Sequence, residues 1–148
     1  MKLRTLIVLS IALLFSCSEK NKNQDQWDKE NIRPLDVDDP RVERARQAAQ
    51  DSLTYFVDYF ERYNGQNNYS FSLKTVFGDK DDFEHMWSTP FSLYDNGFNC
   101  VLDNVPNTLK NYKLGDTVQI HFRDIEDFII VTADSTVIGH YLQTEIGN

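Results

Sequence analysis

The chain has 148 residues, of which 41% are hydrophobic and 26% are charged, a composition typical of globular proteins. Collagen-like, low-complexity and wholly disordered classes are therefore excluded, and the length suits one domain with one sizeable core. The formal charge is −8, because 23 acidic side chains outnumber 15 basic ones. This acidity argues against nucleic acid as a partner and against docking on anionic lipid headgroups by charge, since both need a basic surface.

Residues 1–16 predict a removable signal peptide. Lys2 and Arg4 form a short positive region, and residues 6–15 are an apolar run that only Ser10 interrupts. Ten helical residues extend about 15 Å, half the roughly 30 Å of a bilayer core, so the run is too short to span a membrane and suits a secretory signal. Removal of Lys2 and Arg4 leaves 13 basic against 23 acidic side chains, a net charge of −10.

The signal ends in Leu14-Phe15-Ser16-Cys17, which resembles a bacterial lipobox. The resemblance implies cleavage before Cys17 and acylation of that cysteine with fatty acids such as palmitate, and two or three acyl chains give a stable membrane anchor. The absence of Asp at position 18 favours the outer membrane of a two-membrane bacterium, with the side of the membrane left open. The alternative is a plain secretory signal followed by a chance cysteine.

Residues 17–37 are expected to be the lipidated cysteine and a flexible tether, because the segment is polar and holds too few apolar residues to order itself. Residues 38–148 are expected to form one domain. Acylation of Cys17 leaves Cys100 without an intrachain disulfide partner. A buried thiol is the favoured interpretation of Cys100, and a reactive or intermolecular cysteine is the alternative.

The domain is expected to begin with one long amphipathic helix. Asp38-Asp39-Pro40 supplies a helix cap and a proline at the first helical position, and residues 41–63 carry apolar side chains at helical spacing before Asn64-Gly65. The alanines come early and the aromatic residues late, so the second half of the helix should pack most heavily on the sheet.

After Gly65 the hydrophobic period changes from 3.6 to 2, which predicts strands. We expect them over 69–77, 83–91, 98–102, 118–122, 128–131 and 137–142, with Pro90 marking an edge or a bend. The continuous apolar run 128–131 is typical of a strand covered on both faces. The predicted fold is therefore α+β, with the long N-terminal helix packed on a twisted, mostly antiparallel sheet of five to six strands.

Glu84-His85-Met86-Trp87 is the densest polar and aromatic cluster. Adjacent strand residues point to opposite faces, so Glu84 and His85 should not act on one substrate atom, whereas His85 and Trp87 share a face. Three roles are open for His85: a hydrogen-bonded residue at the edge of the core, a ligand contact beside an aromatic platform, or a catalytic residue.

Other familiar signatures are missing from the sequence. The histidines at 85, 121 and 140 have no metal-ligand spacing, so no metal site is predicted, and no cofactor is predicted either. Paired acids such as Glu126-Asp127 lie at turns or element ends, where caps are more common than acid–base partners. The sequence has no glycine-rich phosphate loop, no Gly-x-Ser-x-Gly elbow and no Cys-x-x-Cys motif. The absence of these motifs makes an enzyme less favoured without excluding one.

Five short motifs follow one another along the chain: Glu84-His85-x-Trp87, Leu102-x-Asn104-x-Pro106, Lys113-x-Gly115-Asp116-x-Val118, Ile125-x-Asp127-Phe128 and Gly139-x-Tyr141. In this order they resemble the motifs of a bacterial family of unknown function, domain of unknown function 2314, over about 39–143. Phe128 stands where the family usually has Trp, and Asn99 or Cys100 where a Gly is common. The resemblance implies a fold and no activity.

Three functional hypotheses remain open. In the first, a lipid-anchored envelope module without catalytic activity binds an envelope protein, with Glu84, His85, Trp87, Asp103, Asn104 and Asp127 as candidate contacts. In the second, an envelope hydrolase uses His85 with a carboxylate from another strand, Asp103 or Asp127. In the third, a structural or stress-protective lipoprotein has no discrete ligand.

Overall fold

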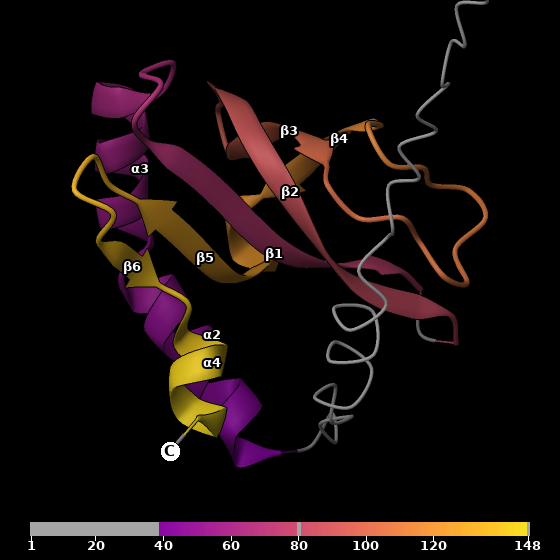
Figure 1. Ribbon diagram of the computed structural model, residues 1–148. Coiled ribbons are helices and arrows are strands. Elements are labelled where there is room, and N and C mark those ends of the chain that lie inside the picture. Colours follow the sequence, from indigo (N-terminus) through magenta and orange to yellow (C-terminus); the bar gives the residue numbers. More distant parts are fainter. Residues whose placement is uncertain (1–38, 80, 148) are drawn as a thin grey trace, which may run out of the picture. The chain divides into compact units, whose positions relative to one another are not determined.

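The computed structural model describes residues 39–79 and 81–147, so the predicted signal peptide, the lipidation site at Cys17 and the tether lie outside the described residues. The described residues all belong to one compact unit. Figure 1 shows helices set against one face of a single sheet. In chain order the elements are α2 (Pro40–Asp51), α3 (Leu53–Tyr63), β1 (Ser70–Gly78), β2 (Phe83–Tyr94), β3 (Gly97–Leu102), β4 (Thr117–His121), the 3-10 helix η1 (Phe122–Asp124), β5 (Ile125–Val131), β6 (Val137–Gly139) and α4 (Tyr141–Ile146).

The six strands form one antiparallel sheet in the order β4-β3-β2-β1-β5-β6. The first four strands are therefore a meander, and the chain then crosses to the other side of β1 to add β5 and β6. The α+β fold class with a six-stranded antiparallel sheet is confirmed.

The predicted single long helix is instead two consecutive helices, α2 and α3, which meet at Ser52. The start is as expected: the Asp39 carboxylate accepts a hydrogen bond from Arg41 N at 2.9 Å, and Pro40 is the first helical residue. At the break, Ser52 Oγ donates to Ala48 O at 2.6 Å. A serine hydroxyl that bonds to the preceding turn competes with the helical backbone, which helical periodicity alone does not reveal.

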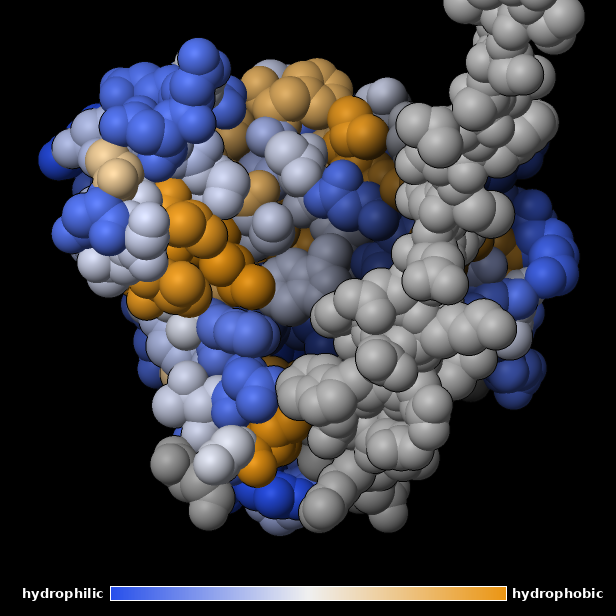
Figure 2. Space-filling model, in the orientation of Figure 1, coloured by the Kyte–Doolittle hydropathy of each residue, from blue (hydrophilic) through white to orange (hydrophobic). Residues whose placement is uncertain are grey.

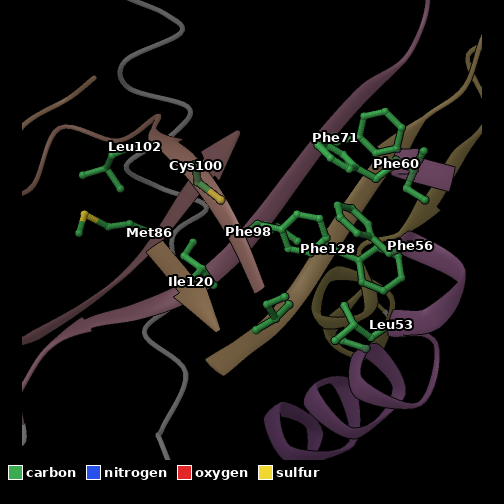
Figure 3. Close-up of a cluster of buried hydrophobic side chains, with 14 of the residues drawn as sticks. Leu53, Phe56, Phe60, Phe71, Met86, Phe98, Cys100, Leu102, Ile120 and Phe128 are labelled. Atoms are coloured by element: carbon green, nitrogen blue, oxygen red, sulfur yellow. The ribbon is translucent and has the colours of Figure 1, made fainter. Parts of the chain in front are cut away.

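The core lies between α3 and the sheet (Figure 3). Phe56 is fully buried, and its ring packs against Phe71, Phe98 and Phe128 at centroid distances of 4.9–5.7 Å. These three rings come from β1, β3 and β5, so one helical side chain joins three strands. The large buried side chains of the helical segment therefore come from its second half, as expected, but α2 also packs closely against β5, so both helices cover the sheet.

Three strand predictions need correction. β5 has Phe128 and Ile130 fully buried but Ile129 and Val131 only partly, because the described helices cover one face of the sheet. Phe122 lies in η1 rather than in a strand. The last strand ends at Gly139, and α4 occupies most of its predicted second half.

Pro90 lies at an edge and beside a bend, as predicted. β1 pairs with β2 only as far as Ser88, so the missing N–H of Pro90 costs no hydrogen bond to β1. The register of β2 with β3 shifts between Pro90 and Ser92, and the strand then continues to Tyr94.

Candidate functional site

The strand β2 exposes a row of side chains, two of them from the Glu84-His85-x-Trp87 motif, on the sheet face opposite α3, which we call the outer face. Met86 and Ser88 are 2% and 0% exposed and point into the core, so the alternating residues Phe83, His85 and Trp87 point outward. The His85 side chain is 37% exposed. Its place is therefore on an open sheet face rather than at the edge of the core.

A bulge in β5 brings a carboxylate to His85. Lys74 pairs with Asp127 and Thr75 pairs with Ile125, which leaves Glu126 as the extra residue of the bulge. His85 Nδ1 donates to Glu126 Oε2 at 2.6 Å, across the intervening strand β1. With the proton on Nδ1, the second ring nitrogen of neutral His85 is a hydrogen-bond acceptor.

Trp87 is the centre of a second group of contacts on the outer face. Lys74 Nζ lies 5.8 Å from the Trp87 ring centroid, within cation–π range. The His140 ring packs against Trp87 in an edge-on arrangement, 6.2 Å between centroids. His140 follows β6 and holds a left-handed backbone conformation with φ of 58°, so the end of the sheet turns this ring toward β2.

We call these side chains the outer-face cluster. They share one sheet face and come from β1, β2, β5 and the turn before α4: Lys74, Val76, Phe83, His85, Trp87, Glu126 and His140. Figure 2 shows the hydropathy of one side of the molecule, where apolar residues gather beside polar ones in the region of β5 and β6. Val76 and Phe83 are 40% and 39% exposed, so the cluster combines apolar and titratable contact groups.

Glu84, a predicted contact residue, instead holds the loop that follows β3. Its carboxylate accepts hydrogen bonds from the backbone N–H groups of Asn107, Thr108 and Leu109 and from the Thr108 hydroxyl. The bonds from Thr108 and Asn107 are the main reason that the pKa of Glu84 falls to about 2. Glu84 and His85 thus work on opposite faces, as the strand geometry predicted.

Asp103 and Asn104 fasten the same loop to β2. Asp103 N donates to Trp87 O at 2.9 Å, and Trp87 N donates to Asn104 Oδ1 at 2.5 Å, so the segment after β3 satisfies the backbone of Trp87. Asp103 Oδ2 also accepts from Thr89 Oγ1 at 2.6 Å. Both residues adjoin the outer-face cluster, but the Asn104 side chain is engaged by the backbone.

Asp127 caps α4. It is 1% exposed, and its carboxylate accepts hydrogen bonds from Phe128 N, Tyr141 N and Leu142 N at 2.8–3.1 Å. The side chain thus satisfies the first backbone donors of the helix. The prediction that the paired acids serve as caps is therefore correct for Asp127. Because Asp127 is buried, it is not available to contact a ligand, contrary to its prediction as a contact residue.

Five members of the outer-face cluster were not among the predicted contact residues: Lys74, Val76, Phe83, Glu126 and His140. His85 was expected to pair with Asp103 or Asp127, whereas its partner is Glu126. Lys74 and His140 were not predicted at all, because their proximity to Trp87 depends on strand pairing and on a turn that breaks the predicted last strand. The only available signal for Glu126 was its position beside the motif residue Asp127.

The described residues set some limits on the chemistry. Among residues 39–79 and 81–147, no three His, Cys, Asp or Glu side chains lie together in a way that could hold a metal ion. Cys100 is fully buried in the core, and burial raises its pKa to about 12, so the thiol is held in its unreactive form. No helix in this part of the chain is long and apolar enough to cross a membrane.

A family model described as an uncharacterized protein conserved in bacteria (DUF2314) matches residues 39–146. The chain belongs to the DUF2314 family. The resemblance inferred from the five short motifs is thereby confirmed. No curated protein and no solved structure shows significant similarity to the chain.

The structure separates the DUF2314-like motif residues by what their side chains do. Glu84, Asn104 and Asp127 accept hydrogen bonds from the backbone. Asp116 accepts one from Lys113 N at 2.8 Å in the Gly-Asp turn. Gly139 passes so close to Phe128 O that a Cβ would lie 2.2 Å away. Within the Glu84-His85-x-Trp87 motif, His85 and Trp87 are the side chains that lie on the outer face.

Proposed function

We propose that the chain is a lipid-anchored protein of the bacterial cell envelope, and that its domain binds a protein partner through the outer-face cluster without catalysing a reaction. The observation that carries the binding proposal is the outward position of the exposed His85 and the partly exposed Trp87 on a sheet face that the described helices leave uncovered. The side chains of Glu84, Asn104 and Asp127 accept hydrogen bonds from backbone N–H groups, so their role is to stabilise the fold. His85 and Trp87 are therefore the better candidates for contact with a partner.

The chemistry of the outer-face cluster suits a protein surface. Protein interfaces are enriched in aromatic residues, and Trp is among the residues that most often dominate the binding energy. Phe83 and Val76 add exposed apolar area on either side of His85. Lys74 and His140 flank Trp87 with groups that can donate hydrogen bonds.

The anchoring proposal rests on the signal-like segment and on Cys17, and it places the domain on the outer membrane. We expect full-length protein to incorporate a clickable palmitate analogue in cells and to sediment with membranes. Cys17→Ala should remove both properties. Labelling that persists in this variant would refute Cys17 as the acylated residue.

Two phenylalanines of β2 offer a matched test of the contact surface. Phe83 and Phe91 are 39% and 47% exposed, and both occupy the outward-facing alternation of the strand. Eight residues of strand separate them by about 26 Å. A photocrosslinking phenylalanine analogue at position 83 of the full-length chain should capture a specific protein in cells, and the same analogue at position 91 should not.

A double variant then tests the assignment. His85→Ala with Trp87→Ala should abolish capture from position 83, whereas Asp124→Ala, a change of an exposed carboxylate outside the cluster, should preserve it. Equal capture from positions 83 and 91 would place the binding surface elsewhere. No capture from either position would favour a protein without a discrete partner.

The His85–Glu126 hydrogen bond supports a second candidate function, an envelope hydrolase. A carboxylate that orients a histidine through Nδ1 leaves the other nitrogen to accept a proton from an attacking water. This function requires turnover. Purified full-length protein should then release soluble fragments from isolated cell envelopes, and both His85→Gln and Glu126→Gln should stop the release. Absence of any fragment release would leave the binding module as the better account.

A further inference from the structure

A second candidate site lies away from the outer-face cluster, where the loop between β5 and β6 approaches α3 (Figure 1). A hollow of 310 Å³ opens there, within the range of sites that take small ligands. One wall consists of two tyrosines, Tyr59 of α3 and Tyr69 before β1. The other consists of residues from the β5–β6 loop and β6: Thr132, Ala133, Asp134, Thr136 and Ile138.

The aromatic wall is part of a row of four tyrosines, in which the rings of Tyr55, Tyr59 and Tyr63 are tilted against one another by 35° and 52° and only Tyr63 and Tyr69 are stacked. Tyr55, Tyr59 and Tyr63 follow one another at intervals of four residues along α3, with ring centroids 4.6 Å and 5.2 Å apart. Tyr63 then stacks on Tyr69, with 4.4 Å between centroids and 9° between planes. Because each ring is held by its neighbour, the wall presents fixed aromatic groups with little rotamer freedom left to lose on binding.

Asp134 supplies a negative charge on the opposite wall. Two hydrogen bonds fix its orientation, from Thr132 Oγ1 at 2.5 Å and from Thr136 N at 3.2 Å, and both end on Oδ1. These bonds keep the pKa of Asp134 below its ordinary value, so the group is ionised at neutral pH. Partial burial raises the pKa of Tyr69, and the charge of Asp134 adds to the rise, which agrees with the two facing one hollow.

The hollow therefore combines two aromatic rings, one carboxylate and no basic residue among its lining side chains. Aromatic rings attract cations through their negative faces, and aromatic cages use this attraction to bind alkylammonium groups. The carboxylate adds an ion pair, and the net charge of −8 favours the approach of a cation. We propose that this hollow binds an alkylammonium group, between the rings of Tyr59 and Tyr69 and the carboxylate of Asp134.

Choline and 3,3-dimethyl-1-butanol provide a matched pair of probes, because they have nearly the same shape and only choline is charged. In NMR titrations of the full-length chain at constant ionic strength, choline should shift the backbone signals of residues 132–136, and the neutral alcohol should not. Equal binding of both probes would show a merely apolar hollow and would overturn the proposal. We expect a Kd of roughly 2.5 mM, so titration to 50 mM reaches about 20 times this value. If no ammonium probe binds up to that concentration, the proposal is also overturned.

Variants locate the site. Asp134→Asn keeps the acceptor for Thr132 and Thr136 while removing the charge, and Tyr69→Leu removes one ring. Each should weaken choline binding about threefold, the size expected for one exposed ion pair or cation–π contact. The matched controls Asp124→Asn and Tyr112→Leu, which change a carboxylate and a partly buried ring outside the hollow, should leave the affinity unchanged. Equal effects of site and control variants would refute the location.

A second pair of probes distinguishes two sources of the ammonium group. Nα-acetyl-lysine methylamide carries the ammonium of a protein lysine, and its Nε-acetylated form does not. Binding of the charged form would assign the hollow to lysine side chains of a partner as well as to small amines. Binding of choline alone would restrict the site to free quaternary amines. Both results support an ammonium site, and stronger binding of the acetylated form would contradict it.

Discussion

Removal of the Asp127 carboxylate should destabilise the domain by a predictable amount. Two of its three hydrogen bonds reach Tyr141 N and Leu142 N of α4, at 3.0 and 3.1 Å, in a site that is almost fully buried. A hydrogen bond to a charged group contributes about 1.5 kcal/mol or more, and a donor left without a partner away from water costs a similar amount. Asp127→Ala should therefore lower the free energy of unfolding by about 3 kcal/mol.

A graded series tests this reasoning better than one variant does. Asp127→Asn keeps Oδ1 as an acceptor and replaces the acceptor of the Leu142 bond, so it should cost about 1.5 kcal/mol. Asp124→Ala removes an exposed carboxylate whose ion pair with Arg123 spans 3.5 Å, and it should cost less than about 0.5 kcal/mol.

Urea unfolding measures all three free energies, and hydrogen exchange at Tyr141 and Leu142 reports on α4 directly. Asp127→Ala should accelerate exchange at these two amides more than at the centre of β1. A loss below about 1 kcal/mol for Asp127→Ala, or unchanged exchange at both amides, would refute the assignment of Asp127 as the cap of α4.

Three further predictions address particular residues. The pKa of Glu84 is lowered from 4.5 to about 2 in the folded state, so the stability that its carboxylate contributes should be present above pH 4.5 and lost as the pH falls toward 2. Urea unfolding across this range should show a weaker pH dependence of the free energy of unfolding for Glu84→Gln than for the unchanged protein. Gly139→Ala would place a Cβ 2.2 Å from a backbone oxygen and should lower the free energy of unfolding by more than about 2 kcal/mol. The control Gly65→Ala, also at positive φ but with no atom within 4 Å of the new Cβ, should lower it by about 1 kcal/mol. Equal losses in the two variants would contradict this account. Burial raises the pKa of Cys100 to about 12, so in a Cys17→Ser variant this thiol should resist a thiol reagent at pH 8 and react only after unfolding. Rapid labelling of the native protein would exclude a buried thiol.

The sequence was informative wherever local chemistry decides the structure. The cap at Asp39 and the buried side chain of Cys100 each follow from a few neighbouring residues, and the structure confirms them. Ser52 shows the limit, because serine occurs in helices at modest cost and only its bond to Ala48 O reveals that the helix ends there. The apolar run 128–131 misled in another way, since hydrophobicity indicates burial but does not say whether a second layer exists.

The candidate site depended on contacts between distant parts of the chain. His85 and Glu126 are 41 positions apart in the sequence. They come together because β2 and β5 both pair with β1 and because β5 has an extra residue, Glu126, at its bulge. Side-chain alternation predicted correctly that Glu84 and His85 serve different faces. It could not predict which carboxylate would reach His85, since the bulge changes the alternation of β5 at the residue concerned.

The roles of the motif residues also explain why the family resemblance indicated a fold but no activity. Four motif side chains, from Glu84, Asn104, Asp116 and Asp127, accept hydrogen bonds from backbone N–H groups. Such residues preserve turns, loops and a short helix whatever the domain binds. His85 and Trp87 have a different relation to the fold, because their side chains lie on the outer face among groups from three other segments. Among the motif residues, a binding role should therefore be sought first at His85 and Trp87, whose side chains lie together on one face of the sheet.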